Sequence, residues 1–137
     1  MTKAGLPKGE DSATDIVRAI LRGALKAART FDSATGGCRL SEASEHFLTA
    51  GIFDSLSRLK GFTHLEVPVG HCMREAGAVR RGRNRRLARM KGRYDIVHYR
   101  ANESPRVAIE VKNAIRSVNR ALLDADFVRL SESLIAN

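Results

Sequence analysis

Two short segments carry the residues whose types and spacing could do chemistry. Asp95 lies in the segment 93–100, and the tripeptide Glu110-Val111-Lys112 ends the segment 106–112. Between them stand five residues, Ala-Asn-Glu-Ser-Pro, which include several strong turn formers. Apolar and β-branched residues alternate with polar ones on both sides, so the pattern predicts a hairpin of two strands.

The spacing within this hairpin predicts which side chains share a face. The turn lies midway between Asp95 and Glu110, so a hairpin folded there sets the two carboxylates opposite each other. Lys112 lies two residues beyond Glu110 and projects from the same face. The other face is expected to belong to the core, with Tyr94, Ile96, Val107, Ile109 and Val111.

Two acids and an amine on one sheet face predict a site for a hard divalent cation. Mg²⁺ takes oxygen ligands, often only one or two carboxylates beside water and substrate phosphate. A bound ion lowers the pKa of a water ligand and stabilises charge on a phosphate oxygen. Lys112 could orient or deprotonate that water, or neutralise the developing charge. The alternative is a strand pair with a Glu–Lys salt bridge, but aspartate is disfavoured within strands and Asp95 stands among apolar residues.

The order Asp95, then Glu110-Val111-Lys112 on the next strand, resembles the PD-(D/E)xK nuclease superfamily. The similarity covers about residues 41–134, with Tyr94 in place of the proline before the aspartate, a change that the superfamily tolerates. The resemblance implies an α/β (α+β) fold with a restriction-endonuclease-like core. Such a core has a central mixed β-sheet of three to four strands flanked by helices, here with an extra N-terminal helix.

The resemblance also implies an activity and its residues. It implies a metal-dependent nuclease in which Asp95, Glu110 and the backbone carbonyl of Val111 bind Mg²⁺ or Mn²⁺, with Lys112 acting on the water. The first core helix of the superfamily often adds an acidic residue to the site, and Glu45 is the candidate here, with Glu42 second. On dipole grounds alone, an acid in a first helical turn is equally explained by helix stabilisation.

The basic charge is concentrated in one segment. The chain has a formal net charge of +9, and eight basic residues with no acidic one fall between positions 80 and 93. The rest of the chain is nearly neutral, so this segment predicts binding to the phosphate backbones of nucleic acid. The resemblance favours DNA over RNA as the partner. A solvated loop, a localisation signal or an anionic membrane patch are the alternatives. The predicted nucleic-acid-binding residues are Arg80, Arg81, Arg83, Arg85, Arg86, Arg89, Lys91 and Arg93.

Hydrophobic periodicity predicts the remaining elements. Residues 1–12 are expected to be a flexible tail, and 13–137 a single domain with a basic loop at 70–93. Helices are expected at 12–31, 41–60 and 117–135, the last packing on the apolar face of the sheet, and a first strand at 62–69. Ser12 and Asp15 have the spacing of a helix cap.

The grouping of His64, His71 and Cys72 matches no established zinc spacing, and His98 is expected to be a hydrogen-bonded core residue.

Composition restricts the class of protein. No stretch is apolar and long enough for a membrane span or a signal sequence, and Cys38 and Cys72 suit reduced thiols, so a cytoplasmic protein is expected. No fourth strand is predicted after Lys112, so a homodimer or another partner could complete the sheet. The alternative function is a non-catalytic nucleic-acid-binding module of the same fold.

Overall fold

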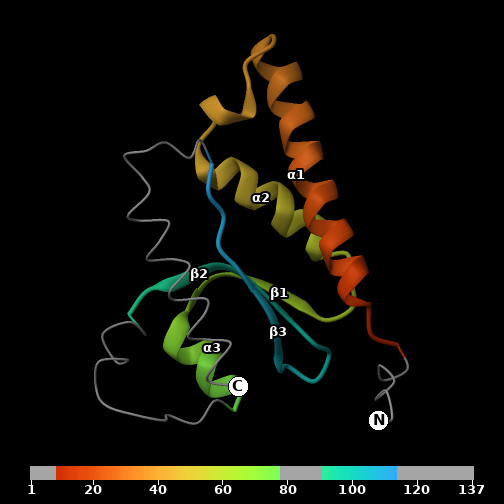
Figure 1. Cartoon of the computed structure of the whole chain (residues 1–137), viewed down its shortest axis with the longest axis vertical. Helices are drawn as coiled ribbons and strands as arrows, with labels where there is room; N and C mark the ends of the chain where they lie inside the picture. The colour runs from red at the N-terminus through yellow and green to blue at the C-terminus, as the bar shows by residue number, and fades with distance from the viewer. Residues whose placement is uncertain (1–8, 78–90, 114–137) are drawn as a thin grey trace.

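A computed structural model describes residues 9–77 and 91–113, and these form helices packed on an antiparallel sheet (Figure 1). The predicted α+β class is confirmed. The predicted helix at 117–135 and six of the eight basic positions, Arg80 to Arg89, lie outside the described residues.

The elements in chain order are α1 (Ala13–Thr35), the 3-10 helix η1 (Leu40–Glu42), α2 (Glu45–Leu56), β1 (Phe62–Pro68), α3 (Val69–Glu75), β2 (Arg93–Tyr99) and β3 (Pro105–Ile109).

Local sequence signals explain where α1 begins and ends. Ser12 and Asp15 form a capping box, in which the Ser12 side chain accepts from the Asp15 backbone N–H and the Asp15 carboxylate accepts from Ser12. These bonds hold the pKa of Asp15 below its ordinary value. At the other end Gly36 takes the left-handed conformation, with φ of 72°, that closes many helices. The expected cap is therefore confirmed, and the helix continues to Thr35, beyond the predicted end at residue 31.

Small residues allow α1 and α2 to approach closely. The buried side of α1 carries Ile16, Ala19, Gly23 and Ala27. A Cβ atom on Gly23 would lie 2.5 Å from the backbone oxygen of Gly51, so the two helices touch at glycine. Ile52 and Leu56 of α2 are buried in the same cluster, which places the helix pair on one face of the sheet.

The sheet has the order β1-β2-β3 and, within the described residues, all its strand pairs are antiparallel. Ile96 pairs with Ile109 and Val97 with Ala108, which is the register predicted for the hairpin. The expectation of a mixed sheet is not met by the described strands, because β1 pairs with β2 and β2 pairs with β3 in antiparallel orientation. No fourth strand occurs in the described residues.

Strand β2 is buried on both faces of the sheet, whereas the sequence predicted one apolar face. Ile96 and Val111 pack with α1 and α2, but Val97 and Tyr99 are buried on the opposite face with Val69 and Cys72 of α3. Tyr94, predicted on the same face as Ile96, belongs instead to the α3 cluster. The regular alternation is broken opposite this point, because Glu66 of β1 has a φ of 55° and its neighbours Leu65 and Val67 pair with Ile96 and Tyr94.

Two element predictions need correction. Helix α3 lies at the start of the segment 70–93 that was predicted to be a loop, and its two buried residues are too few to give a clear helical period. The predicted helix 41–60 is divided, because Ala43 and Ser44 are extended and α2 begins only at Glu45. A tight turn formed by the Leu59 N–H and the Leu56 carbonyl follows α2 before β1.

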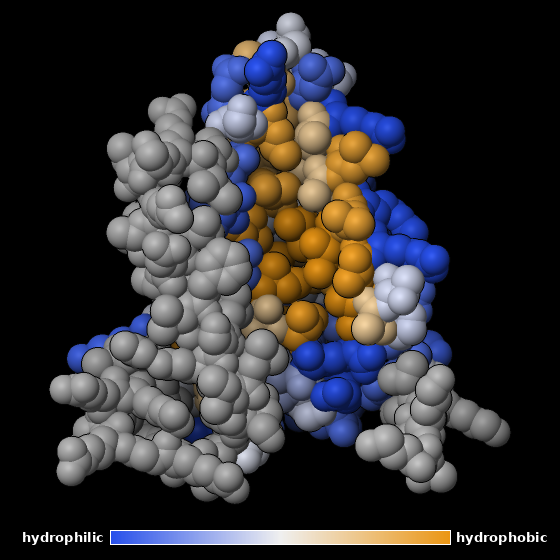
Figure 2. All heavy atoms as spheres, viewed as in Figure 1, coloured by the Kyte–Doolittle hydropathy of each residue, from blue (hydrophilic) through white to orange (hydrophobic). Residues whose placement is uncertain are grey.

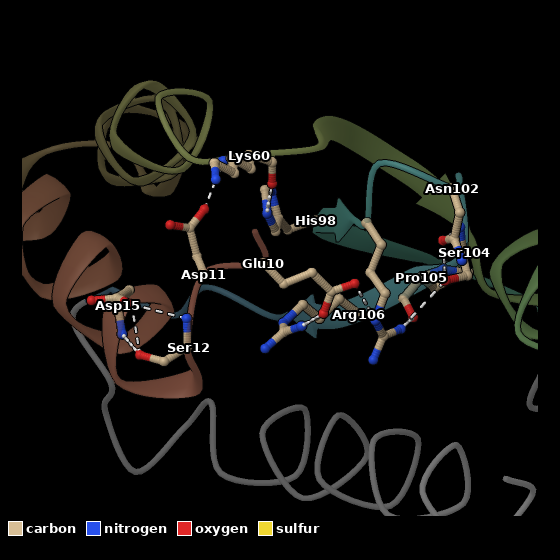
Figure 3. A network of polar contacts seen from close by, with 11 residues as sticks. Glu10, Asp11, Ser12, Asp15, Lys60, His98, Asn102, Ser104, Pro105 and Arg106 are labelled. Atoms are coloured by element: carbon tan, nitrogen blue, oxygen red, sulfur yellow. Dashed lines mark hydrogen bonds and ion pairs between the residues drawn. The ribbon is translucent and has the colours of Figure 1, made fainter. Parts of the chain in front are cut away.

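The residues just before α1 are bound to the sheet, although the sequence assigned them to a flexible tail. Arg106 and Arg100 both form ion pairs with the Glu10 carboxylate, and Asp11 accepts the backbone N–H of Lys60 at 2.7 Å (Figure 3). Residues 9–12 therefore join the base of α1 to the β2–β3 hairpin. No helix within 9–77 or 91–113 is long and apolar enough to cross a bilayer.

Candidate functional site

The predicted site residues come from three elements that meet near the start of α2. Glu45 is the first residue of α2, Asp95 lies in β2, and residues 110–113 follow directly after β3. In Figure 1 the chain after β3 continues past the sheet towards the beginning of α2. This path, rather than a longer β3, brings the tripeptide to Glu45.

Lys112 and Glu45 form an ion pair across this junction. The Lys112 Nζ lies 3.6 Å from Oε1 of Glu45, and the two side chains are 31% and 39% exposed. The second carboxylate oxygen of Glu45 accepts the backbone N–H of Asn113 at 3.2 Å. Glu45 was assigned to the site by resemblance only, and the structure brings it to Lys112; Glu42, the second choice, lies in η1 and is exposed.

Asp95 binds the backbone of the tripeptide. Its Oδ2 accepts the N–H of Val111 at 2.6 Å, the length of a strong charge-assisted hydrogen bond. Because β3 ends at Ile109, Val111 has left the strand ladder and its buried N–H needs another acceptor. This explains an aspartate in the middle of an apolar strand.

Glu110 lies next to this bond. The pair Ile96 and Ile109 is the last in the β2–β3 register, and Asp95 and Glu110 are the residues that adjoin this pair on the two chain segments. Both side chains are half-buried. The structure thus brings Asp95 to Val111 and Glu45 to Lys112. The two contacts are adjacent, because Val111 and Lys112 are consecutive residues.

Asn113 is a residue of this junction that the sequence analysis missed. Its side-chain amide donates to the Leu40 carbonyl at 2.8 Å and to the Ala43 carbonyl at 3.1 Å. These carbonyls belong to the break between η1 and α2, so Asn113 ties the end of the hairpin to the turn that precedes Glu45. An isolated Asn after a strand carries no motif, and no sequence signal identifies this role.

The oxygen atoms near the tripeptide could supply a hard cation with only a few protein ligands, so that water would have to supply the others. The described residues contain no group of three or more His, Cys, Asp or Glu side chains that could hold a metal ion. The smaller set that the sequence predicted consists of the carboxylates of Asp95 and Glu110 and the carbonyl of Val111, and all of these donors are oxygen atoms. This set fits Mg²⁺, which commonly keeps several waters and takes one or two carboxylates.

The basic segment is described only at its end. Lys91 and Arg93 are exposed, and Arg93 reaches the Glu66 carbonyl at 3.5 Å. Arg93 opens β2 two residues before Asp95, so this end of the basic segment lies on the strand that carries the candidate site.

The histidines and cysteines have other surroundings. His98 is buried, with Nε2 donating to the Lys60 carbonyl and Nδ1 bonded to Thr63, so the expectation of a hydrogen-bonded core histidine is confirmed. Cys38 and Cys72 are free. Burial raises the pKa of the Cys72 thiol to about 11, with a further contribution from Glu75.

Comparison with known proteins identified no relative of this chain. No protein-family profile matches the chain, and no curated protein and no solved structure is significantly similar to it. The functional interpretation therefore depends on the residues themselves.

Proposed function

We propose that this chain is a metal-dependent nuclease of the restriction-endonuclease-like type, hydrolysing phosphodiester bonds of DNA in preference to RNA. The observation that supports it best is the meeting of Asp95 and Glu45 with the Glu110-Val111-Lys112 tripeptide, through the Asp95–Val111 hydrogen bond and the Glu45–Lys112 ion pair. Carboxylates can hold a metal ion that activates water, and a lysine can stabilise the charge that develops on the phosphate.

Each residue has a role in the proposal. Asp95, Glu110 and the Val111 carbonyl would hold Mg²⁺ or Mn²⁺, which when bound supplies an activated water and stabilises charge on the phosphate. Lys112 orients the water and neutralises charge on the phosphate oxygens. Glu45 positions Lys112 through their ion pair and adds to the negative charge of the site.

The basic segment supplies substrate attraction in this proposal. Arg80 to Arg93 hold the excess positive charge of the chain and lead directly into the strand of Asp95. Binding through phosphates is salt-dependent and independent of sequence, so the segment would bring many nucleic acids to the same site.

A cleavage assay tests the proposal. Supercoiled plasmid, single-stranded DNA and RNA are incubated with the protein in Mg²⁺ or Mn²⁺, or in EDTA, beside the Asp95→Asn and Asp54→Asn variants. Asp54 is an exposed acid of α2, outside the candidate site, and serves as the matched control. The proposal expects metal-dependent cutting of DNA that Asp95→Asn removes and Asp54→Asn retains. Equal cutting by both variants, or none by the wild type, would overturn it.

A specific observation favours a second candidate, a nucleic-acid-binding module without catalysis. Asp95 and Glu45 both have partners within the chain, in the Val111 N–H, the Asn113 N–H and the Lys112 ammonium. Such bonds also suit a purely structural junction. In that case gel retardation would show binding that is lost when Arg80 to Arg93 are neutralised, with no cleavage and no effect of Asp95→Asn.

A further inference from the structure

An exposed apolar strip follows α1 beside its contact with α2. Val17, Leu21 and Leu25 are 52%, 64% and 51% exposed. Their four-residue spacing places them in one row on the helix. In Figure 2 apolar side chains form a continuous patch over α1 and α2, bordered by hydrophilic residues. Apolar surfaces of this kind mark interaction sites.

The strip lies outside the contact between the helices. Helix α1 packs on α2 through Ile16, Ala19, Gly23 and Ala27, which are mostly small, while its larger apolar residues lie to one side. A helix whose apolar face is wider than one contact needs a second neighbour to bury it. Phe47 of α2, itself 36% exposed, extends the strip at the end where its ring meets Phe31 of α1.

We propose that residues 117–135 of the same chain cover this strip as an amphipathic helix antiparallel to α1. The apolar residues of the segment recur at helical spacing, at Leu123, Phe127, Leu130 and Leu134. This segment was expected on the apolar face of the sheet, but there the central strand β2 is already buried, by α1 and α2 on one side and by α3 on the other.

The end of the described chain lies in the right place for this arrangement. Asn113 is held at the start of α2 by the Leu40 and Ala43 carbonyls, and the Phe31–Phe47 contact shows that the C-terminal end of α1 is nearby. The three residues 114–116 lead from Asn113 to the first residue of the segment, and these four steps of extended chain reach about 14 Å. A 19-residue helix is about 28 Å long, within the roughly 35 Å of α1, so it can follow the strip back towards Val17.

Charge favours this segment over a second copy of the protein. Arg18, Arg22 and Lys26 are exposed along α1 beside the strip. Segment 117–135 has three acidic and two basic residues, whereas a second α1 would bring another four basic residues with only two acidic ones. Like charges on facing helices destabilise their contact.

Disulfide trapping in the full-length chain tests the proposal. In a Cys38→Ser background, Leu21→Cys is combined in turn with Leu123→Cys, Phe127→Cys and Leu130→Cys, and the same three are combined with Arg22→Cys as the control. Cys72 can remain, because its thiol is buried and its pKa is raised to about 11. Oxidation at about pH 8 is followed by non-reducing electrophoresis and peptide mapping.

The proposal expects an intramolecular disulfide in at least one Leu21→Cys pair and none in the Arg22→Cys pairs. Disulfide-linked dimers of Leu21→Cys alone would overturn it in favour of a second copy, and the absence of any intramolecular bond would overturn it altogether.

Thermal unfolding gives a second measurement. Leu21→Ser should lower the Tm by at least about 4 °C if the strip is covered, and Arg22→Ser by less than about 1 °C. An unchanged Tm in Leu21→Ser contradicts the proposal.

Discussion

The Lys112 ammonium lies 3.6 Å from a carboxylate oxygen of Glu45, which joins the end of the β2–β3 hairpin to the first residue of α2. The hydrogen bond from the Val111 N–H to Asp95 is one residue away. A change at any of these side chains therefore affects the path of the chain after β3 as well as any chemistry there. Cleavage and unfolding measured on the same variants separate the two effects.

Replacing the lysine distinguishes chemistry from structure. Lys112→Met should lower metal-dependent cleavage at least about 100-fold, because it removes the cation that the proposal sets beside the phosphate. It should change the free energy of unfolding by no more than about 1 kcal/mol, because the ion pair is about one-third exposed and screened by water. Plasmid cleavage and urea unfolding measure the two quantities.

The control for this experiment is Lys26→Met. Lys26 forms a comparable ion pair with Asp54 of α2, at 3.5 Å, on an exposed surface. Lys26→Met should leave cleavage unchanged. If both lysine variants reduce cleavage equally, Lys112 has no special role in the reaction.

Asn113 should contribute to stability rather than to chemistry. Asn113→Ala removes two hydrogen bonds to the Leu40 and Ala43 carbonyls and should lower the free energy of unfolding by about 1–2 kcal/mol. Asn113→Asp has the same shape but turns acceptor oxygens towards those carbonyls, so its loss should be at least as large. Denaturant unfolding measures both, and losses below about 0.5 kcal/mol in both variants would contradict the assigned role.

The glycine contact between α1 and α2 should be intolerant of side chains. In Gly23→Ala the new methyl group would lie 2.5 Å from the Gly51 oxygen and 2.8 Å from the Ile52 Cα, and both are backbone atoms. The helices must separate, so we expect a loss of about 1–3 kcal/mol, despite the better helix propensity of alanine. Arg22→Ala, at the exposed neighbouring position, should stay within about 0.5 kcal/mol. Similar stabilities of the two variants would show that the contact is looser than described.

His98 should make the stability depend on pH. Burial lowers the pKa of His98 from its ordinary value of 6.5, outweighing the bond to the Lys60 carbonyl, which raises it. Below about pH 6.5 the unfolded chain binds this proton more readily than the folded chain, so the free energy of unfolding falls as the pH falls through this window. The stabilisation is fully present above that pH, and the slope from this residue is at most about 1.4 kcal/mol per pH unit.

Urea unfolding between about pH 5 and about pH 8 measures this effect. The His98→Gln variant should lose the part of the slope that belongs to this residue. His46→Gln, at an exposed position of α2, should keep it. A slope that is the same in the wild type and in His98→Gln would rule out His98 as its source.

The amino-acid sequence by itself determined several local elements and one strand register. The cap of Ser12 and Asp15, the existence of helix α1 and the turn between β2 and β3 depend on residues close in sequence, and all three are confirmed. The pairing of β2 with β3 followed from the turn, because a short loop restricts the register of the strands that it joins.

Only the tertiary structure decided how these elements meet. The end of β3 at Ile109, the contact of Lys112 with Glu45 and the bonds of Asn113 to residues 40 and 43 all join parts of the chain far apart in sequence. Helix α3 and the second buried face of the sheet arise from packing, since Val69 and Cys72 form too short a pattern to predict a helix. Local periodicity specifies which residues are apolar, whereas the neighbour that buries them depends on the packing of the whole chain.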